Sequence, residues 1–510
     1  MGSGTISRNE MMSLDTPEVS TVSLLSPHEH NQQLPANPAA VYRNFVVMAI
    51  FFSIHHGCVV SCLSLATTRL GPNVGAGQSS LLYVCYTGSA LVGSTYIVKH
   101  WGAHRALTVG MFLYCFYVAA FWSAAHWQAS WAAYTGAVLG GLGAGLVWTA
   151  QGSFFAQAAQ AHAATVNNND EGTNSDADTS ASRSTASMAG IFAFFYLALE
   201  LLLRSLSSLA AWTALFQIYA LATIIATLGM AFVVKPPNLV PERIPKERPS
   251  ASLLWYQVTA AIQLWNPSSV MPLMLGMNAV FGFESAFLNA YINGQVVPAA
   301  SVGLWMAWAS GVASLWSLVF ARWTASGNDS SPHNATKDRK GWVLSAGAAC
   351  FASVVLPFVV QPDVTQWASS SSFRRGLVLF WIYTLHGTGR ATFEGTLKAT
   401  FADFFAHEKE GAFANIILQN GLASSLGYFL TARLKCDAPA GDDHNTSSYC
   451  VPYNDGSYHH MGWMEVFILT VGVLAILGYW KAAKTVQRQQ NRGDVSSDSD
   501  GETNEPREFT

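Results

Sequence analysis

Charge is the scarcest property of this 510-residue sequence. Only 11% of its residues are Asp, Glu, Lys or Arg, against about 25% in ordinary soluble proteins. A soluble chain of this length would need more charge on its surface, whereas 51% of these residues are hydrophobic. The net charge of -3 and the lack of a basic stretch interleaved with aromatics argue against a nucleic-acid partner.

Cysteine is also scarce, and the 7 present cannot build a disulfide framework in so long a chain. Five of them lie inside apolar runs, where a small buried side chain is expected rather than metal or redox chemistry: Cys58, Cys62, Cys85, Cys115 and Cys350. The sequence also lacks a P-loop, a paired set of catalytic carboxylates and a nucleophile beside a base. We therefore expect no metal site, no cofactor and no enzyme activity.

The dominant feature of the sequence is a series of long apolar runs. From Asn44 onward, twelve runs have the length of about 20 residues that crosses a hydrocarbon core of ~30 Å. The runs lack the alternation of strands, and only helices or closed barrels satisfy the backbone in lipid. We predict an all-α protein of the lipid bilayer with spans at 44–66, 80–98, 105–124, 131–155, 187–206, 211–234, 268–291, 300–321, 341–360, 376–398, 412–432 and 461–481.

A proline-rich segment between the sixth and seventh runs divides the chain. Lys235 to Ser250 holds five prolines, which rule out a continuous helix. It separates two six-helix halves, 42–234 and 267–482, and the linker 235–266 could carry an amphipathic surface helix over Ser252 to Trp265. Three polar segments are predicted to be disordered: the tails 1–41 and 483–510, and an insertion at 160–186.

The distribution of Lys and Arg predicts the orientation. With both termini cytoplasmic, the outer loops carry six of the 27 basic residues, Arg390 lies within a span, and the others are cytoplasmic. The last outer loop contains the sequon at Asn445 and the pair Cys436 and Cys450, so glycosylation and a disulfide are expected there. An unused sequon and two unpaired thiols remain the alternative. The membrane is the plasma membrane or an endomembrane.

The run at 376–398 carries ionisable residues where lipid is expected. His386, Arg390, Glu394 and Lys398 are four apart and form one stripe on a helix. Because an ionisable group at the bilayer centre costs roughly 2.5 to 3.5 kcal/mol, the stripe must face a bundle interior or a water-filled cavity. Two interpretations stay open: the stripe lines a central site, or Arg390 and Glu394 merely pair with each other near a helix end.

Two further carboxylates lie inside apolar runs. Glu284 falls in the middle of the seventh run, where it must be protonated or paired. Pairing with Arg390 would join the seventh and tenth spans, whereas a titrating Glu284 would suit proton coupling. Glu200 precedes Arg204 by four residues, and we expect the two to pair near the outer end of the fifth span.

Polar and aromatic residues of the first and fourth spans complete the candidates. His55 and His56 are adjacent, so their side chains point about 100° apart and at most one faces a central cavity; His55 is taken as the candidate. A histidine there could carry protons or simply pack. Trp148 and Gln151 are three apart and could offer a substrate an aromatic wall and an amide, with core packing as the alternative.

The fourth span also carries a family resemblance. Its segment GLGAGLVWTAQGSFF, residues 141–155, resembles the hallmark of the Unc-ninety-three-like branch of the major facilitator superfamily, the ion-channel regulatory proteins. Arg43-Asn44, the turn at 98–105, and the segment from Gly389 to Phe404 agree with that branch. The turn departs from the usual facilitator signature, with His104 near the place of an acidic residue. The resemblance implies twelve helices in two pseudo-symmetric six-helix bundles.

Two functions follow from these features. The first is a transporter that moves a small solute or ion by alternating access, with Glu284, Arg390 and Glu394 at its centre. The alternative, implied by the resemblance, is a protein that transports nothing and regulates or escorts a membrane-protein partner, an ion channel or a receptor. A continuous polar cavity between the halves would favour the transporter. The identities of solute, coupling ion and partner stay open.

Overall fold

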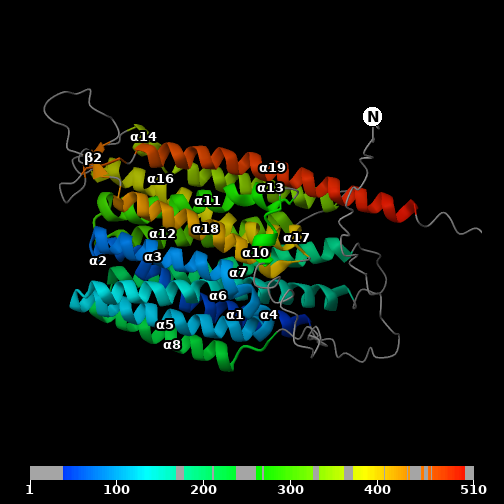
Figure 1. Cartoon of the computed structure of the whole chain (residues 1–510), viewed down its shortest axis with the longest axis horizontal. Helices are drawn as coiled ribbons and strands as arrows, with labels where there is room; N and C mark the ends of the chain where they lie inside the picture. Colours follow the sequence, from blue (N-terminus) through cyan, green and yellow to red (C-terminus); the bar gives the residue numbers. More distant parts are fainter. Residues whose placement is uncertain are drawn as a thin grey trace, which may run out of the picture. The chain divides into compact units, whose positions relative to one another are not determined.

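The computed structural model describes residues 38–167, 177–209, 212–236, 260–266, 269–325, 332–360, 372–406, 408–433, 435–436, 450–452, 458–460 and 462–499. Helices make up nearly all of this part of the chain (Figure 1). The first half contains α1 (Pro38–Ser64), α2 (Ala66–Arg69), α3 (Pro72–Ser89), η1 (Ala90–Ser94), α4 (Thr95–Trp101), α5 (Ala103–Trp127), α6 (Ser130–Asn167), α7 (Ala177–Leu209) and α8 (Trp212–Phe232). The prediction of an all-α fold is confirmed.

The part of the chain after the proline-rich segment is also helical. Its elements are α11 (Met271–Phe287), η2 (Leu288–Val296), α12 (Val302–Ala325), α13 (Pro332–Ser353), α14 (Leu356–Val360), α16 (Ser372–Ala391), η3 (Thr392–Leu397), α17 (Lys398–Phe404), α18 (Lys409–Arg433) and α19 (Gly462–Ser499). Of the predicted surface helix in the linker, the described part contains α10 (Ala260–Gln263). The segments η1, η2 and η3 are π-helical.

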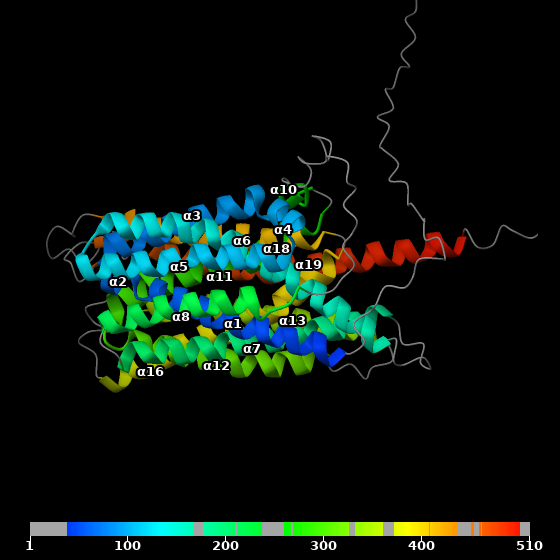
Figure 2. The ribbon, with the colours of Figure 1, turned by 90° about the horizontal axis from the view of Figure 1, so that it is seen from below.

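Within the described residues, 9 helices are long and apolar enough to cross a membrane. The other three predicted runs lie in α6, in α16 with its continuation through α17, and in α18. These three contain the glycine motif of the fourth span, the charged stripe, and a series of amide and hydroxyl residues, which lower their hydropathy. The long helices lie side by side with roughly parallel axes in both views (Figure 2).

Helix extends further into the polar segments than predicted. The expected insertion at 160–186 is helical up to Asn167 and again from Ala177. In place of the tail at 483–510, α19 continues to Ser499 and projects past its neighbours in both figures. The N-terminal tail likewise ends earlier, because α1 begins at Pro38. The polar composition of these segments predicts disorder. They are nevertheless helical next to the spans, where they are rich in Ala, Gln, Lys and Arg, which are good helix formers.

One break inside a predicted span and one turn beside it depend on glycine. Gly93 has φ 100° where η1 interrupts the second span. Gly102, in the turn at 98–105, has φ 80° and separates α4 from α5. These are backbone conformations that glycine adopts without a steric penalty. The turn predicted between the second and third spans is therefore made by Gly102.

Four helices form most of the contact between the two halves. Helix α7 packs along α12, and α3 packs along α18. In Figure 1 the second-half helices α13, α16 and α19 lie above α1, α5 and α8 of the first half. The two halves are joined around a shared interior by two helix pairs, α7 with α12 and α3 with α18.

A short sheet lies near the start of α19. Strand β3 (Tyr458–His460) pairs in antiparallel fashion with β1 (Lys435–Cys436) on one side and β2 (Cys450–Pro452) on the other. Cys436 is opposite Tyr458 and Cys450 is opposite His460, so the two cysteines occupy the outer strands and do not face each other in register. The Cys436–Cys450 disulfide stays a prediction, as does glycosylation of Asn445, which lies outside the described residues.

The glycines of the fourth span create close helix contacts. A Cβ added to Gly145 would lie 2.0 Å from Ser89 Oγ and 2.8 Å from the backbone nitrogen of Ala90. A Cβ at Gly88 of α3 would meet nothing within 4 Å. Residue 145 must therefore be small for α6 and α3 to approach this closely.

We predict opposite effects of Gly145→Ala and Gly88→Ala on thermal stability. The first substitution forces α6 away from α3 and should destabilise the protein by about 1 to 3 kcal/mol, the usual range for overpacking. The second adds a better helix former in open space and should be neutral or stabilising by up to about 1 kcal/mol. Apparent melting temperatures of the detergent-purified variants check this. Equal effects of the two alanines would contradict the proposed packing role of Gly145.

Candidate functional site

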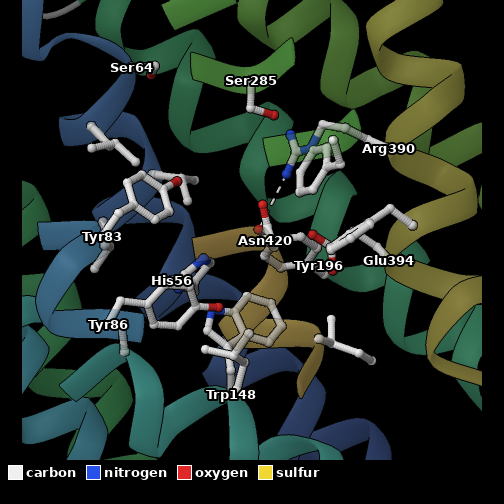
Figure 3. Close-up of a pocket in the computed structure, with 18 of the residues that line it drawn as sticks. His56, Ser64, Tyr83, Tyr86, Trp148, Tyr196, Ser285, Arg390, Glu394 and Asn420 are labelled. Atoms are coloured by element: carbon white, nitrogen blue, oxygen red, sulfur yellow. Dashed lines mark hydrogen bonds between the residues drawn. The ribbon is translucent and has the colours of Figure 1, made fainter. Parts of the chain in front are cut away.

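A cavity of about 110 Å³ lies between the two halves (Figure 3). Its first-half lining combines aliphatic side chains and the polar Ser64, Gln151 and Arg204 with six aromatic residues: His56, Tyr83, Tyr86, Tyr114, Trp148 and Tyr196. Its second-half lining is mainly polar or charged: Ser285, Asn289, His386, Arg390, Glu394, Lys398 and Asn420. Side chains from α1, α6, α11 and α16 with its continuation thus share one polar space.

The charged stripe faces this cavity along its whole length. His386 and Arg390 lie in α16, Glu394 in η3 and Lys398 at the start of α17, and all four line the cavity. In a regular α-helix of 3.6 residues per turn, positions four apart drift around the axis. The wider π-helical turn of η3 counteracts that drift. The helix interruption therefore keeps Glu394 and Lys398 on the same side as Arg390.

Arg390 forms an ion pair with Glu200 of the other half. Its Nη1 and Nη2 donate to the two carboxylate oxygens of Glu200 at 2.5 and 2.9 Å. Arg204 Nη1 lies 2.9 Å from the same carboxylate, and Ser310 Oγ donates to it at 2.9 Å. All four side chains are buried. A carboxylate can remain charged in such a place only with this number of donors.

Glu394 pairs with Lys398 and not with Arg390. Lys398 Nζ donates to Glu394 Oε2 at 2.6 Å, an i,i+4 contact along η3 and α17. The ammonium also lies 4.0 Å from the centroid of the Trp148 ring and 5.1 Å from that of Phe192. The alternative in which Arg390 and Glu394 pair with each other is therefore wrong, because Glu200 on α7 supplies a bidentate partner for the guanidinium.

Of the two roles left open for Glu284, the structure shows a paired carboxylate, but its partner is not Arg390. It is fully buried in α11, and both of its carboxylate oxygens lie 2.9 Å from His386 Nδ1. The pair does join the seventh and tenth spans, through His386 rather than Arg390. Glu284 does not line the cavity, whereas His386 does. A hydrogen-bonded carboxylate and imidazole therefore lie directly behind the cavity wall.

The histidine candidate of the first span was assigned to the wrong neighbour. His55 faces α5, where its Nε2 lies 3.7 Å from Cys115 Sγ. His56 lines the cavity and packs edge-on against Trp148, with ring centroids 4.8 Å apart. The expectation that at most one of the two reaches the cavity holds. Periodicity alone could not choose between them, because the rotation of α1 is set by its neighbours.

Trp148 and Gln151 both line the cavity. Sequence reasoning missed Tyr196 and the central role of Glu200. The predicted Glu200–Arg204 pair is present, yet the carboxylate was expected near a helix end and not at the contact between halves. A signal was available: Glu200 is a carboxylate in an apolar run, as Glu284 is, and Tyr196 lies one turn before it.

Contacts between the halves lie at both ends of the cavity. Where α4 ends and α18 begins, Lys99 Nζ is 2.9 Å from Glu408, and Ser153 Oγ donates to Glu410 at 2.9 Å. The ring of Phe413 fills the space that a Cβ at Gly152 would need. At the opposite end, Thr67 Oγ1 of α2 donates to the carbonyl of Asn289 at 3.1 Å, and Ser80 Oγ of α3 donates to the carbonyl of Ser425 at 3.2 Å.

The arrangement fits binding better than covalent chemistry. The ionisable residues at the cavity are held by one another: Glu200 by two guanidinium groups, Glu394 by Lys398, and Glu284 by His386. Within the described residues, no group of three or more His, Cys, Asp or Glu side chains is placed to hold a metal ion. A bound solute would meet an aromatic wall on one side and polar groups on the other.

Comparison with known structures identifies the fold. The structure resembles the human organic anion transporter MFSD10 with a TM-score of 0.54 and 11% identity, covering 87% of this chain and 99% of the transporter. The nucleoside transporter NupG gives 0.54 and 9%, covering 87% and 99%. The proton:xylose symporter XylE, a major facilitator protein, gives 0.53 and 13%, covering 87% and 95%. At these identities the similarity shows the fold alone.

The sequence comparison identifies the branch. Residues 68–293 match the family model described as ion channel regulatory protein UNC-93. No curated protein matches the sequence significantly. The matched range includes the segment at 141–155 that carries the resemblance, and the fold is the one which that resemblance implies. The chain is thus a multi-pass membrane protein with the fold of major facilitator transporters, and its residues 68–293 are similar to the UNC-93 family.

Proposed function

We propose that this protein moves a small polar solute or ion across a membrane by alternating access of its two halves. The observation that carries the proposal is the cavity between the halves, which is lined by the charged stripe of α16 to α17 and by the aromatic wall of α6 and α7. Buried charges are costly in a protein that spans lipid, and they usually mark a solute or ion pathway. A purely structural interior would pack as well with apolar side chains.

The halves are proposed to be 42–234 and 267–482, with both termini in the cytoplasm. In this orientation the contacts of Lys99 with Glu408 and of Ser153 with Glu410 close the cytoplasmic end of the cavity. The contact of Thr67 with Asn289 lies at the outer end. Alternating access would break the contacts at one end and then at the other. A protein of this function is not an enzyme. With both termini in the cytoplasm, the sequon at Asn445 would lie on the side of the membrane where glycosylation occurs.

A second candidate function is regulation of another membrane protein without transport. It is supported by the match to the UNC-93 ion channel regulatory family over 68–293. The pairing of cavity charges with one another is also compatible with it, because Glu200 contacts both Arg204 and Arg390. A folded protein that takes up none of a broad panel of polar solutes, yet co-purifies with a channel or receptor subunit, would favour this function.

The first test asks whether uptake passes through the cavity. Purified protein in lipid vesicles is screened with labelled small polar solutes, and the active solute is then measured with Asn420→Trp. The indole would fill space lined by Asn420, so saturable uptake should be lost. Leu422→Trp, two residues away on α18 and 58% exposed, is the matched control and should retain uptake. Equal uptake by the two variants would remove the cavity from the pathway.

A second prediction concerns proton coupling through Glu284 and His386. The pair is buried behind the cavity wall, with His386 Nδ1 2.9 Å from the Glu284 carboxylate, and ionisable pairs inside membrane spans are the usual parts of proton relays. Glu284→Gln should abolish the dependence of uptake on external pH while leaving the folded protein intact. Glu465→Gln provides the control, because Glu465 is also a buried carboxylate in a span but does not line the cavity. If the pH dependence of Glu284→Gln matches that of the wild type, Glu284 has no coupling role.

A third prediction concerns the ion pair between the halves. Glu200→Gln leaves two buried guanidinium groups without a counter-charge and should cost roughly 3 to 5 kcal/mol. Arg390→Met should cost less, because Glu200 keeps its contact with Arg204. Apparent melting temperatures should therefore fall in the order wild type, Arg390→Met, Glu200→Gln.

Lys99→Met serves as the control for this series. The ion pair of Lys99 is partly exposed, so its loss should cost under about 1 kcal/mol. A larger loss of stability for Arg390→Met than for Glu200→Gln would contradict the charge balance described for the buried cluster.

A further inference from the structure

The ammonium group of Lys398 lies in a site built from aromatic rings of the opposite half. Its Nζ is 4.0 Å from the Trp148 ring centroid and 5.1 Å from that of Phe192. On its other side it donates to Glu394 Oε2 at 2.6 Å. The residue is 5% exposed. One carboxylate and two ring faces thus surround a single cation.

The rings hold one another in place. Tyr196 stacks on Phe192 with an interplanar angle of 5° and meets Trp148 edge-on, with ring centroids 5.9 Å apart. His56 packs edge-on against Trp148 from the other side. Because each ring is fixed by two neighbours, the ring faces are arranged before any cation arrives. Such preorganisation lowers the entropic cost of binding.

The chemistry of this site is that of ammonium recognition. Aromatic faces attract cations through the ring quadrupole, Trp most strongly, and the attraction grows when water is excluded. A carboxylate adds charge and a hydrogen-bond acceptor. We propose that the cavity takes a small organic cation, a primary or quaternary ammonium compound, at the site formed by Glu394, Trp148 and Phe192, and that Lys398 occupies this site until the compound displaces it. The inference rests on the proposed transport function and names its substrate class.

The other cavity charges do not offer an equivalent site for an anion. Both terminal nitrogens of Arg390 are committed to Glu200. Arg204 Nη1 contacts Glu200, the carbonyl of Met306 and Ser310. Arg204 Nε has no partner among the described residues, and a single N–H makes no anion site. An anion would therefore have to break an existing buried ion pair, whereas an organic cation replaces one ammonium by another.

Displacement gives Lys398 a defined role in release. The entering cation takes over the contact with Glu394 and the ring faces, and the ammonium of Lys398 leaves. Since Lys398 is tethered next to the site, its effective concentration is high, and its return competes the ligand off. Wild-type protein should therefore bind ammonium compounds weakly. Removal of the lysine side chain should leave a vacant site of higher affinity.

The experiment uses full-length protein with Lys398→Ala in detergent, and propylammonium as the probe. The alanine lacks the last three carbons and the ammonium group of lysine, which propylammonium replaces. We expect propylammonium to raise the apparent melting temperature of Lys398→Ala by a few degrees, with little shift for the wild type. Lys398→Met is the volume-matched control, because its neutral side chain fills the site, and it should show little shift.

Specificity is tested with three comparisons. Propanol and propionate have the same carbon chain without the positive charge and should not stabilise Lys398→Ala. Tetramethylammonium should stabilise it, because the ring faces do not require an N–H donor. Adding Trp148→Leu to Lys398→Ala should weaken the apparent affinity for propylammonium roughly tenfold. The inference would be overturned if the apparent melting temperature of folded Lys398→Ala were unchanged by both ammonium compounds. An equal rise with propanol would also overturn it.

A second measurement needs no variant of Lys398. Vesicles with wild-type protein are tested for uptake of ammonium compounds beside sugars, carboxylates and nucleosides. Uptake of another class without any ammonium compound would reject the cation site and keep the transport proposal. Binding of propylammonium to Lys398→Ala without any uptake by the wild type would reject transport and keep the site. Uptake of an ammonium compound that Trp148→Leu weakens would support both.

Discussion

The carboxylate of Glu200 is the point on which the interior of this protein depends. It is fully buried on α7 and forms ion pairs with two guanidinium groups, one from its own helix and one from α16 of the other half. Without it, Arg204 and Arg390 would be uncompensated charges in a bilayer-spanning bundle, a state that costs several kcal/mol. The contact between the halves is thus held by an ion pair in addition to the packing of α7 on α12.

The ionisable side chains near the cavity divide into two groups by what they touch. Arg390 and Glu200 join the two halves through carboxylate and guanidinium, a bidentate geometry that is specific and difficult to replace. Glu394 and Lys398 lie on the same helix, and the ammonium reaches the other half only through ring faces. A point charge over an aromatic face has few directional demands. The second group is therefore the one that can exchange partners.

The sequence was sufficient for the all-α, multi-pass fold, because membrane length and desolvation cost act locally along a helix. It could not assign partners. Arg390 was expected to meet Glu284 or Glu394, and it meets Glu200 instead, because the choice depends on the rotation and depth of α7 against α16. The same holds for His55 and His56: their relative angle was known, whereas the rotation of α1 was not. The π-helical turn at η3 had no sequence signal at all, although it keeps Glu394 and Lys398 facing the cavity.

The contact of Lys398 with Trp148 depends on how the fourth span, α6, packs against its neighbours. The glycines and Trp148 of the segment at 141–155 carry the family resemblance. In the structure these residues all affect the contact between α6 and the ammonium of Lys398. Gly145 lets α6 approach α3, and Gly152 makes room for Phe413 of α18. The ring of Trp148 between them meets the ammonium from α17. A larger residue at either glycine would move α6 and change the distance between this ring and the ammonium. Close packing of α6 is thus a condition for the cation site as well as for stability.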